Sequence, residues 1–193
     1  MRGTLAVCYR IHPRMLRPLA VIASAILLSR PDLARDDAER FAKVVREEAK
    51  ARGFDPLTMV AIVHSESGWH PGTVSPNRED YGLGQIRARF IGACKGDSDP
   101  LDAPSAECRA VKESLLDAET NLRAMAQLIT DHRKICLEKA KSAALPRWLA
   151  SYQGLNFPKQ KRWCVPNEKT WRVIKYRDFL LREAGKPKPP AKR

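Results

Sequence analysis

The sequence predicts one mainly α-helical domain, and three observations support this prediction. Apolar residues recur at three- and four-residue steps in several segments, which is the spacing of one buried face of a helix. The alternating pattern typical of strands is scarce. The 193 residues contain no internal repeat and are enough for a single domain with a sizeable core.

The first helix of this domain is expected between residues 36 and 53. Asp36 or Asp37 supplies its N-cap, and Gly53 ends it. Its buried stripe consists of Phe41, Val44, Val45 and Ala49. The predicted domain extends over residues 35–185.

The second helix carries an acidic residue in an unusual place. Asp55 is its expected N-cap, Pro56 its first residue, and Gly68 its left-handed C-terminal cap. Glu66 falls in line with an apolar stripe formed by Met59, Ile62 and Val63.

Two effects disfavour the ionised form of Glu66. Burial opposes its charge, and so does the negative end of the helix dipole. A carboxyl group that stays protonated near neutral pH is what a general acid requires. The alternative is a solvated residue at the edge of the helix. The turn-rich segment that follows favours the acid, because a helix end that opens onto irregular loops can border a cleft.

The middle of the chain is expected to be mostly irregular. Residues 69–81 are predicted to be a loop or a short hairpin, and residues 83–91 a short helical piece. Residues 94–115 are rich in Asp, Pro and Gly, so they are predicted to lack regular structure.

Three further helices are expected after this region. Asp117 opens the longest one, and Pro146 lies in the first turn of the next. Asn167 caps the last helix, which Gly185 ends.

The N-terminus has the pattern of an export signal. Arg10, Arg14 and Arg17 precede an apolar run at 19–28, which is too short to span a bilayer. Residues 1–34 are therefore predicted to be a signal peptide, with no membrane span left after its removal. The alternative interpretation of the apolar run is a short buried helix.

The chain has a formal net charge of +13, and it ends in a basic, proline-rich stretch at 186–193 that is predicted to be disordered. A basic excess suits an anionic partner, such as nucleic acid, acidic lipid or an acidic wall polymer. No basic segment is interleaved with aromatic residues as in nucleic-acid-binding motifs, so a nucleic-acid partner is not expected.

Four cysteines follow the predicted signal, which favours disulfides and a periplasmic or secreted protein. None is in a Cys-x-x-Cys spacing typical of zinc sites, and free buried thiols are the alternative. Of the three possible connectivities, we favour Cys94 with Cys108, which closes the Asp/Pro-rich loop, and Cys136 with Cys164.

Several short motifs resemble the lytic transglycosylase and goose-type lysozyme family. They are Glu66-Ser67, Ser75, the Gly-Leu-Gly-Gln-Ile run at 82–86, and Ala-Ser-Tyr-Gln at 150–153. The resemblance covers roughly residues 38–155. The chain has Gly84 where the family usually has Met, and Ser-Tyr-Gln at 151–153 where the family usually has Ala-Tyr-Asn.

This resemblance implies a lysozyme-like α(+β) fold, with a small loop or hairpin region beside the helix that bears Glu66. It implies cleavage of peptidoglycan strands between MurNAc and GlcNAc, with Glu66 as general acid and base and anhydro-muramic acid as product. The expected protein is a monomer that needs no cofactor and no metal. The expected substrate-binding residues are Ser67, Ser75, Tyr81, Gln85, Tyr152 and Gln153.

Two alternatives remain open at this stage. A hydrolytic muramidase would use Asp80 as a second carboxylate, since Asp80-Tyr81-Gly82 looks like the equivalent run in chicken-type lysozyme; Glu79 is a weaker rival. Asp80 could instead only cap a turn. A wall-binding module without catalysis is the alternative outside enzymes, and the differences at Gly84 and Gln153 motivate it.

Overall fold

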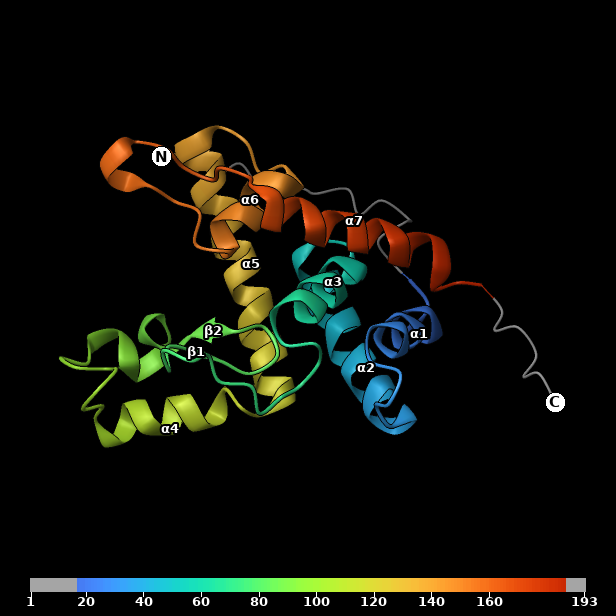
Figure 1. Cartoon of the computed structure of the whole chain (residues 1–193), viewed down its shortest axis with the longest axis horizontal. Helices are drawn as coiled ribbons and strands as arrows, with labels where there is room; N and C mark the ends of the chain where they lie inside the picture. Colours follow the sequence, from blue (N-terminus) through green and yellow to red (C-terminus); the bar gives the residue numbers. More distant parts are fainter. Residues whose placement is uncertain (1–16, 187–193) are drawn as a thin grey trace, which may run out of the picture.

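The computed structural model describes residues 17–186, and it confirms the prediction of a mainly α-helical fold (Figure 1). Seven α-helices run through this part of the chain, and two short strands form the one hairpin described within it. The helices are α1 (Leu19–Ser29), α2 (Arg35–Arg52), α3 (Pro56–Glu66), α4 (Ala106–Ser114), α5 (Ala118–Ala140), α6 (Leu145–Tyr152) and α7 (Glu168–Glu183).

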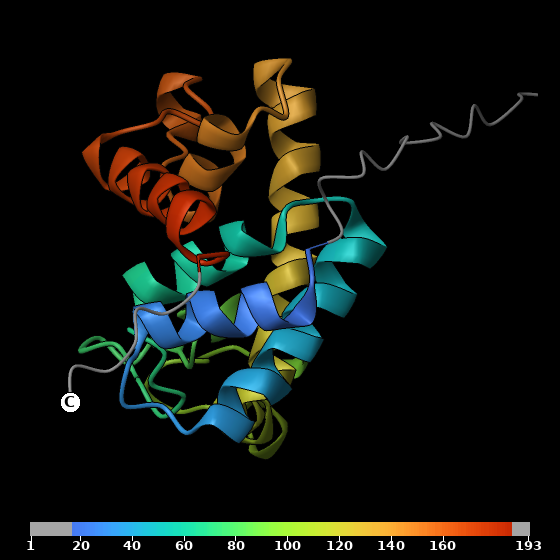
Figure 2. The ribbon, with the colours of Figure 1, turned by 90° about the vertical axis from the view of Figure 1, so that its right-hand side faces the viewer.

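Helix α3 is the centre of the core, because every residue from Pro56 to Val63 is buried. A helix that is apolar on all sides must be enclosed by other elements, and α1, α2 and α7 pack around it. Figure 2 shows α1 and α2 lying in front of and below α3, with α7 above. The Asp55 carboxylate accepts the Leu57 N–H at 3.0 Å, as predicted for the N-cap.

The apolar run predicted as part of an export signal forms α1. Ile22 and Ile26 are fully buried against the rest of the core. The Ser29 hydroxyl lies 2.9 Å from the Tyr176 hydroxyl, and the Arg30 guanidinium donates to the Trp69 carbonyl at 2.7 Å. In this structure the run is thus a short buried helix, and removal of residues 1–34 stays a prediction. Among residues 17–186, no helix has both the length and the apolar character needed to cross a membrane.

A two-stranded hairpin lies against α5. Strands β1 (Asp80–Tyr81) and β2 (Ile86–Arg87) pair antiparallel. The buried Asn121 of α5 donates to the Tyr81 carbonyl at 2.8 Å and accepts the Gly84 N–H at 2.7 Å. Gly82 has φ +71°, and a Cβ there would come within 2.2 Å of the Leu115 carbonyl oxygen. The close docking of the hairpin therefore requires glycine at 82.

The predicted helical piece at 83–91 is wrong in its first half. Gln85 has φ +47°, which breaks a helix and turns the chain from β1 into β2. Only Ala88–Phe90 is helical there, as the 3-10 helix η2.

The prediction that residues 94–115 lack regular structure holds for 97–105 and is wrong at both ends of the segment. The 3-10 helix η3 (Gly92–Gly96) opens this segment, and α4 closes it. The Ser105 hydroxyl caps α4 by accepting the Cys108 N–H at 3.2 Å.

The start of α2 also differs from the prediction. Ala34 occupies the N-cap position, and the predicted caps Asp36 and Asp37 lie inside the first turn. Their charges there are favourable to the helix dipole, so the acidic pair still marks the helix start. The caps predicted for α5 and α7 are confirmed, since Asp117 accepts the Thr120 N–H at 2.8 Å and Asn167 forms a capping box with Thr170.

Both favoured disulfides are present. Cys94–Cys108 ties η3 to α4, and Cys136–Cys164 ties α5 to the segment before α7. The basic tail from residue 187 onward and the residues before Arg17 lie outside the described part of the chain.

Candidate active site

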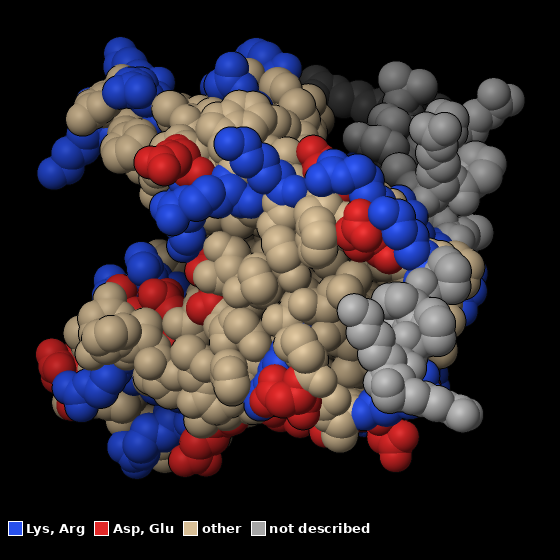
Figure 3. All heavy atoms as spheres, turned by 45° about the vertical axis from the view of Figure 1, so that its right-hand side comes forward, with Lys and Arg blue, Asp and Glu red and all other residues tan. Residues whose placement is uncertain are grey.

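A cleft of about 440 Å³ separates two parts of the molecule. One wall comes from the ends of α3 and α6 and from the start of α7, and the hairpin forms the opposite wall, with α5 between them. Figure 3 shows a hollow at the edge of this face, with basic side chains above it, where α7 lies. The cleft is therefore accessible to a large ligand.

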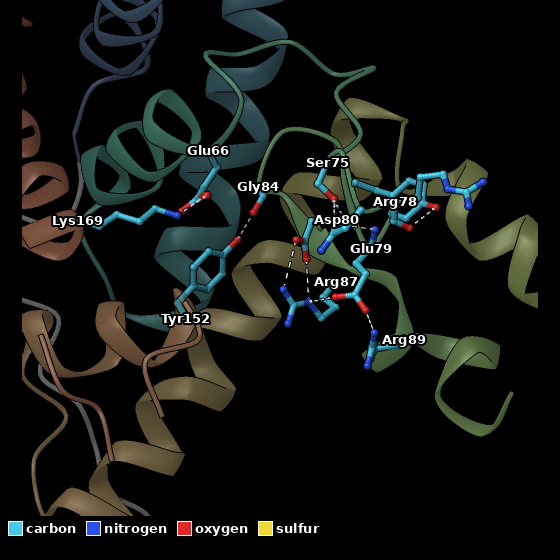
Figure 4. Close-up of polar contacts among 12 residues, drawn as sticks. Glu66, Ser75, Arg78, Glu79, Asp80, Gly84, Arg87, Arg89, Tyr152 and Lys169 are labelled. Carbon is cyan, nitrogen blue, oxygen red and sulfur yellow. Dashed lines mark hydrogen bonds and ion pairs between the residues drawn. The ribbon is translucent and has the colours of Figure 1, made fainter. Parts of the chain in front are cut away.

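Glu66 lies on the helix wall, at the last residue of α3. Its side chain is only 12% exposed, and its Oε2 accepts a hydrogen bond from the Lys169 ammonium at 3.1 Å (Figure 4). The other oxygen, Oε1, is buried and makes no regular hydrogen bond with a described residue, although the Gln153 side chain interacts with this carboxyl group. Burial raises the pKa of Glu66, and the Lys169 charge opposes this rise.

Asp80 lies on the hairpin wall of the same cleft. Its carboxylate accepts from the Arg87 guanidinium at 3.0 and 3.4 Å, and its own N–H donates to the Ser75 hydroxyl at 2.9 Å. Its negative charge adds to the rise in the pKa of Glu66. Glu79 instead pairs with Arg87 and Arg89 and does not line the cleft.

Tyr152 connects the two walls. It lines the cleft, as expected for a substrate-binding residue, but its hydroxyl donates to the Gly84 carbonyl at 2.7 Å. A Cβ at residue 84 would lie 2.9 Å from this hydroxyl and 3.2 Å from Met125. Tyr152 and Met125 thus occupy the space that a side chain at 84 would need. Burial raises the pKa of Tyr152 well above its usual value, so the hydroxyl remains a donor.

Both predicted glutamines line the cleft. The Gln85 amide donates to the Thr73 carbonyl at 3.2 Å and to the Gly82 carbonyl at 3.0 Å, so it holds the hairpin turn together. The Gln153 oxygen accepts from the Thr170 hydroxyl at 2.8 Å. The Gln153 Nε2 is buried and makes no regular hydrogen bond in the described part of the chain, but the Gln153 side chain interacts with the Glu66 carboxyl group and lowers its pKa slightly.

The other three predicted substrate-binding residues do not line the cleft. The Ser67 hydroxyl donates to a carbonyl of α3, and the Ser75 hydroxyl donates to Asn77. Tyr81 is 8% exposed, and its hydroxyl donates to the Arg78 carbonyl. In this structure they shape the loops beside the site.

Several cleft residues were not predicted from the sequence, and four of them offer groups that could contact a ligand. Phe90 is 58% exposed at the hairpin side, where its ring offers an apolar surface for a sugar. His132 and Asn156 both contact the Ser151 hydroxyl at 2.8 Å. Lys169 comes from a helix 103 residues beyond Glu66. An exposed aromatic residue is a usable sequence signal, but the position of Lys169 follows only from the packing of α7.

Within the described residues, no group of three or more His, Cys, Asp or Glu side chains is placed to hold a metal ion. The groups available for chemistry at the cleft are carboxylates, amides, a phenol and basic side chains. Such groups support proton transfer and the binding of a polar ligand.

The mainly helical fold, with a buried glutamate beside a cleft, is consistent with the lysozyme-like class of proteins. Residues 43–163, well over half of the chain, match the family model of the transglycosylase SLT domain. The chain belongs to this family, and membership implies lytic transglycosylase activity on peptidoglycan. The match leaves α1 and α7 outside it. Neither the search of curated proteins nor that of solved structures gave a match.

Proposed function

We propose that this protein is an exported lytic transglycosylase in which Glu66 is the single acid and base. The observation that carries the proposal is the contrast between the two carboxylates of the cleft. Glu66 is buried, has a raised pKa and keeps one oxygen without a regular hydrogen bond to a described residue. Asp80 is held by two contacts from Arg87.

The reaction follows from a carboxyl group that can first give and then take a proton. Protonated Glu66 gives its proton to the glycosidic oxygen, and the bond to C1 of the muramic residue breaks. The C6 hydroxyl of the same residue then attacks C1 and loses its proton to the Glu66 carboxylate. The product is a 1,6-anhydro ring, no water is consumed, and Glu66 is again protonated.

Hydrolysis is the second candidate function, and one observation favours it. Asp80 lines the same cleft as Glu66, as a second carboxylate would in a muramidase. Against it stands the Arg87 guanidinium, which occupies the Asp80 oxygens that would have to face the sugar or the attacking water. A wall-binding module without catalysis is the third candidate.

Digestion of purified sacculi separates the three candidates. Released muropeptides should end in anhydro-muramic acid, each lighter by one water than the hydrolysed product in mass spectrometry. Reducing muramic acid as the main product would identify a muramidase. Strong binding without any release would identify a binding module.

We also propose that the protein works in the periplasm or outside the cell, and the two disulfides support this location. The predicted signal at residues 1–34 has a competing interpretation, because α1 packs in the core. The intact mass of exported protein distinguishes them: a chain that starts near residue 35 indicates cleavage, and a chain that keeps α1 indicates a structural helix.

A further inference from the structure

Lys169 occupies a position that helix stability does not explain. It lies in the first turn of α7, two residues after the N-cap Asn167. A positive charge there is unfavourable, because the N-terminus of a helix is itself the positive end of the dipole. The family match ends at residue 163, so the resemblance does not account for Lys169 either.

The contact that Lys169 makes is with Glu66. Its ammonium lies 3.1 Å from Glu66 Oε2, and its side chain is 44% exposed while that of Glu66 is 12% exposed. A four-carbon stem with this exposure can turn toward the cleft, whereas the buried carboxylate cannot follow it. The pair can therefore separate by movement of the lysine alone.

Pairing with an ammonium favours the ionised form of Glu66, which has no proton to give. The ammonium thus opposes part of the rise in pKa that burial gives Glu66, so the protonated form is populated less than burial alone would allow. A ligand that draws the ammonium away removes this restraint. Muramic acid can do so, since its lactyl group ends in a carboxyl group that chitin lacks.

We propose that Lys169 is a specificity-determining residue: when a glycan strand binds, its ammonium leaves Glu66 and pairs with a carboxylate of the strand. This inference rests on the proposed function and names how its substrate is recognised. The carboxylate is either the free lactyl group of a bare strand or a carboxylate of a stem peptide. Once Lys169 has moved, the buried Glu66 takes up a proton and can act as acid.

The remaining charged and titratable groups of the cleft do not replace Lys169. Asp80 of β1 carries a negative charge, and Arg87 of β2 is bound to it. His132 of α5 has a pKa lowered by burial, and the Tyr152 hydroxyl of α6 stays protonated. Departure of Lys169 therefore leaves no cation bonded to Glu66 among the described residues.

A binding experiment in an inactive background tests the exchange. Glu66→Gln and the double variant Glu66→Gln/Lys169→Met are titrated with a bare MurNAc-GlcNAc tetrasaccharide, the same strand with stem peptides, and chitotetraose. Glu66→Gln should bind one of the muramic strands about tenfold more tightly than chitotetraose, and Lys169→Met should remove that preference. Tighter binding of the bare strand would identify the lactyl carboxylate, and tighter binding of the strand with stem peptides would identify a stem-peptide carboxylate. Equal preference in both variants would overturn the proposal.

A pH profile of cleavage supplies a readout that a structural lysine would not change. Removing the ammonium raises the pKa of Glu66, so the protonated acid persists to higher pH. The basic limb of kcat/KM for Lys169→Met should therefore shift to higher pH than in the wild type. Lys175→Met is the matched control, because it removes the same charge from an exposed position of α7.

The two proposals fail in different ways. If the wild type releases nothing from sacculi, the proposed function is wrong. The wild type could instead cleave sacculi while Lys169→Met behaves like Lys175→Met, with an unchanged basic limb in the pH profile of kcat/KM and an unchanged preference for muramic strands. In that case only the proposed role of Lys169 is wrong.

Discussion

The two walls of the cleft carry the same kind of pair in different settings. Glu66 ends a helix that is buried from Pro56 to Val63, and it accepts one bond from Lys169. Asp80 belongs to a two-residue strand and accepts two bonds from Arg87. A bidentate guanidinium holds a carboxylate in place through two bonds, whereas a single flexible ammonium can leave. The difference teaches that the carboxyl group of the helix wall can lose its partner, while that of the hairpin wall is held in a fixed position.

The largest expected effect comes from Glu66→Gln, which removes the proton donor and keeps the shape. We expect the rate of sacculus digestion to fall about 10²–10⁴-fold, as for loss of a general acid. Turbidity clearing measures the rate, and circular dichroism verifies that the variant is folded. Clearing at the wild-type rate would remove Glu66 from the mechanism.

The disulfides allow the walls to be weakened one at a time. Cys136–Cys164 closes 28 residues on the helix side, and Cys94–Cys108 closes 14 residues on the hairpin side. Replacing either pair by serine should lower the free energy of unfolding by about 3–4 kcal/mol, slightly more for the longer loop. Urea unfolding measures both. A clearly larger loss for the shorter loop would contradict the dependence on loop length.

Tyr152 tests the contact between the walls. Tyr152→Phe removes the hydroxyl that donates to Gly84 and leaves that carbonyl without this donor. The free energy of unfolding should fall by about 1–2 kcal/mol. Thermal unfolding measures the loss. A stability equal to that of the wild type would mean that the walls are held together by packing alone.

The smallest effect is expected from Asp80→Asn. The amide keeps the size of the side chain and can still accept from Arg87, so cleavage should fall less than about tenfold, well below the general-acid effect. The products should remain anhydro-muramic acid. A loss as large as that of Glu66→Gln, with reducing ends in the digest, would make Asp80 the second carboxylate of a hydrolase.

Much of the fold could be predicted because helix ends are encoded locally. Asp55, Asp117 and Asn167 each cap the helix that follows. The start of α4 could have been predicted in the same way from Ser105, but the surrounding Asp and Pro residues favoured an irregular segment. The turn at Gln85 could not, since its positive φ depends on the docking of the hairpin.

The part of the candidate site that lies on a single helix could be predicted from the sequence. Glu66 follows from the apolar stripe of its own helix. The partners of the two carboxylates differ in this respect: Arg87 is seven residues from Asp80, whereas Lys169 is 103 residues from Glu66. The first pairing is set by the register of a short hairpin. The second depends on how α7 packs on α3, and no local pattern in the sequence reports such packing.

The bond between Cys136 and Cys164 has a consequence for when the enzyme can act. Its loop contains all of α6, and Cys164 lies five residues before Lys169. The reducing cytosol keeps such cysteines as free thiols, so a newly made chain lacks this disulfide. We therefore expect a latent enzyme during synthesis that becomes active on oxidation, which protects the cell that makes it. The double variant Cys136→Ser/Cys164→Ser, which keeps the Cys94–Cys108 bond, should clear sacculi more slowly than the wild type; equal rates would exclude this latency.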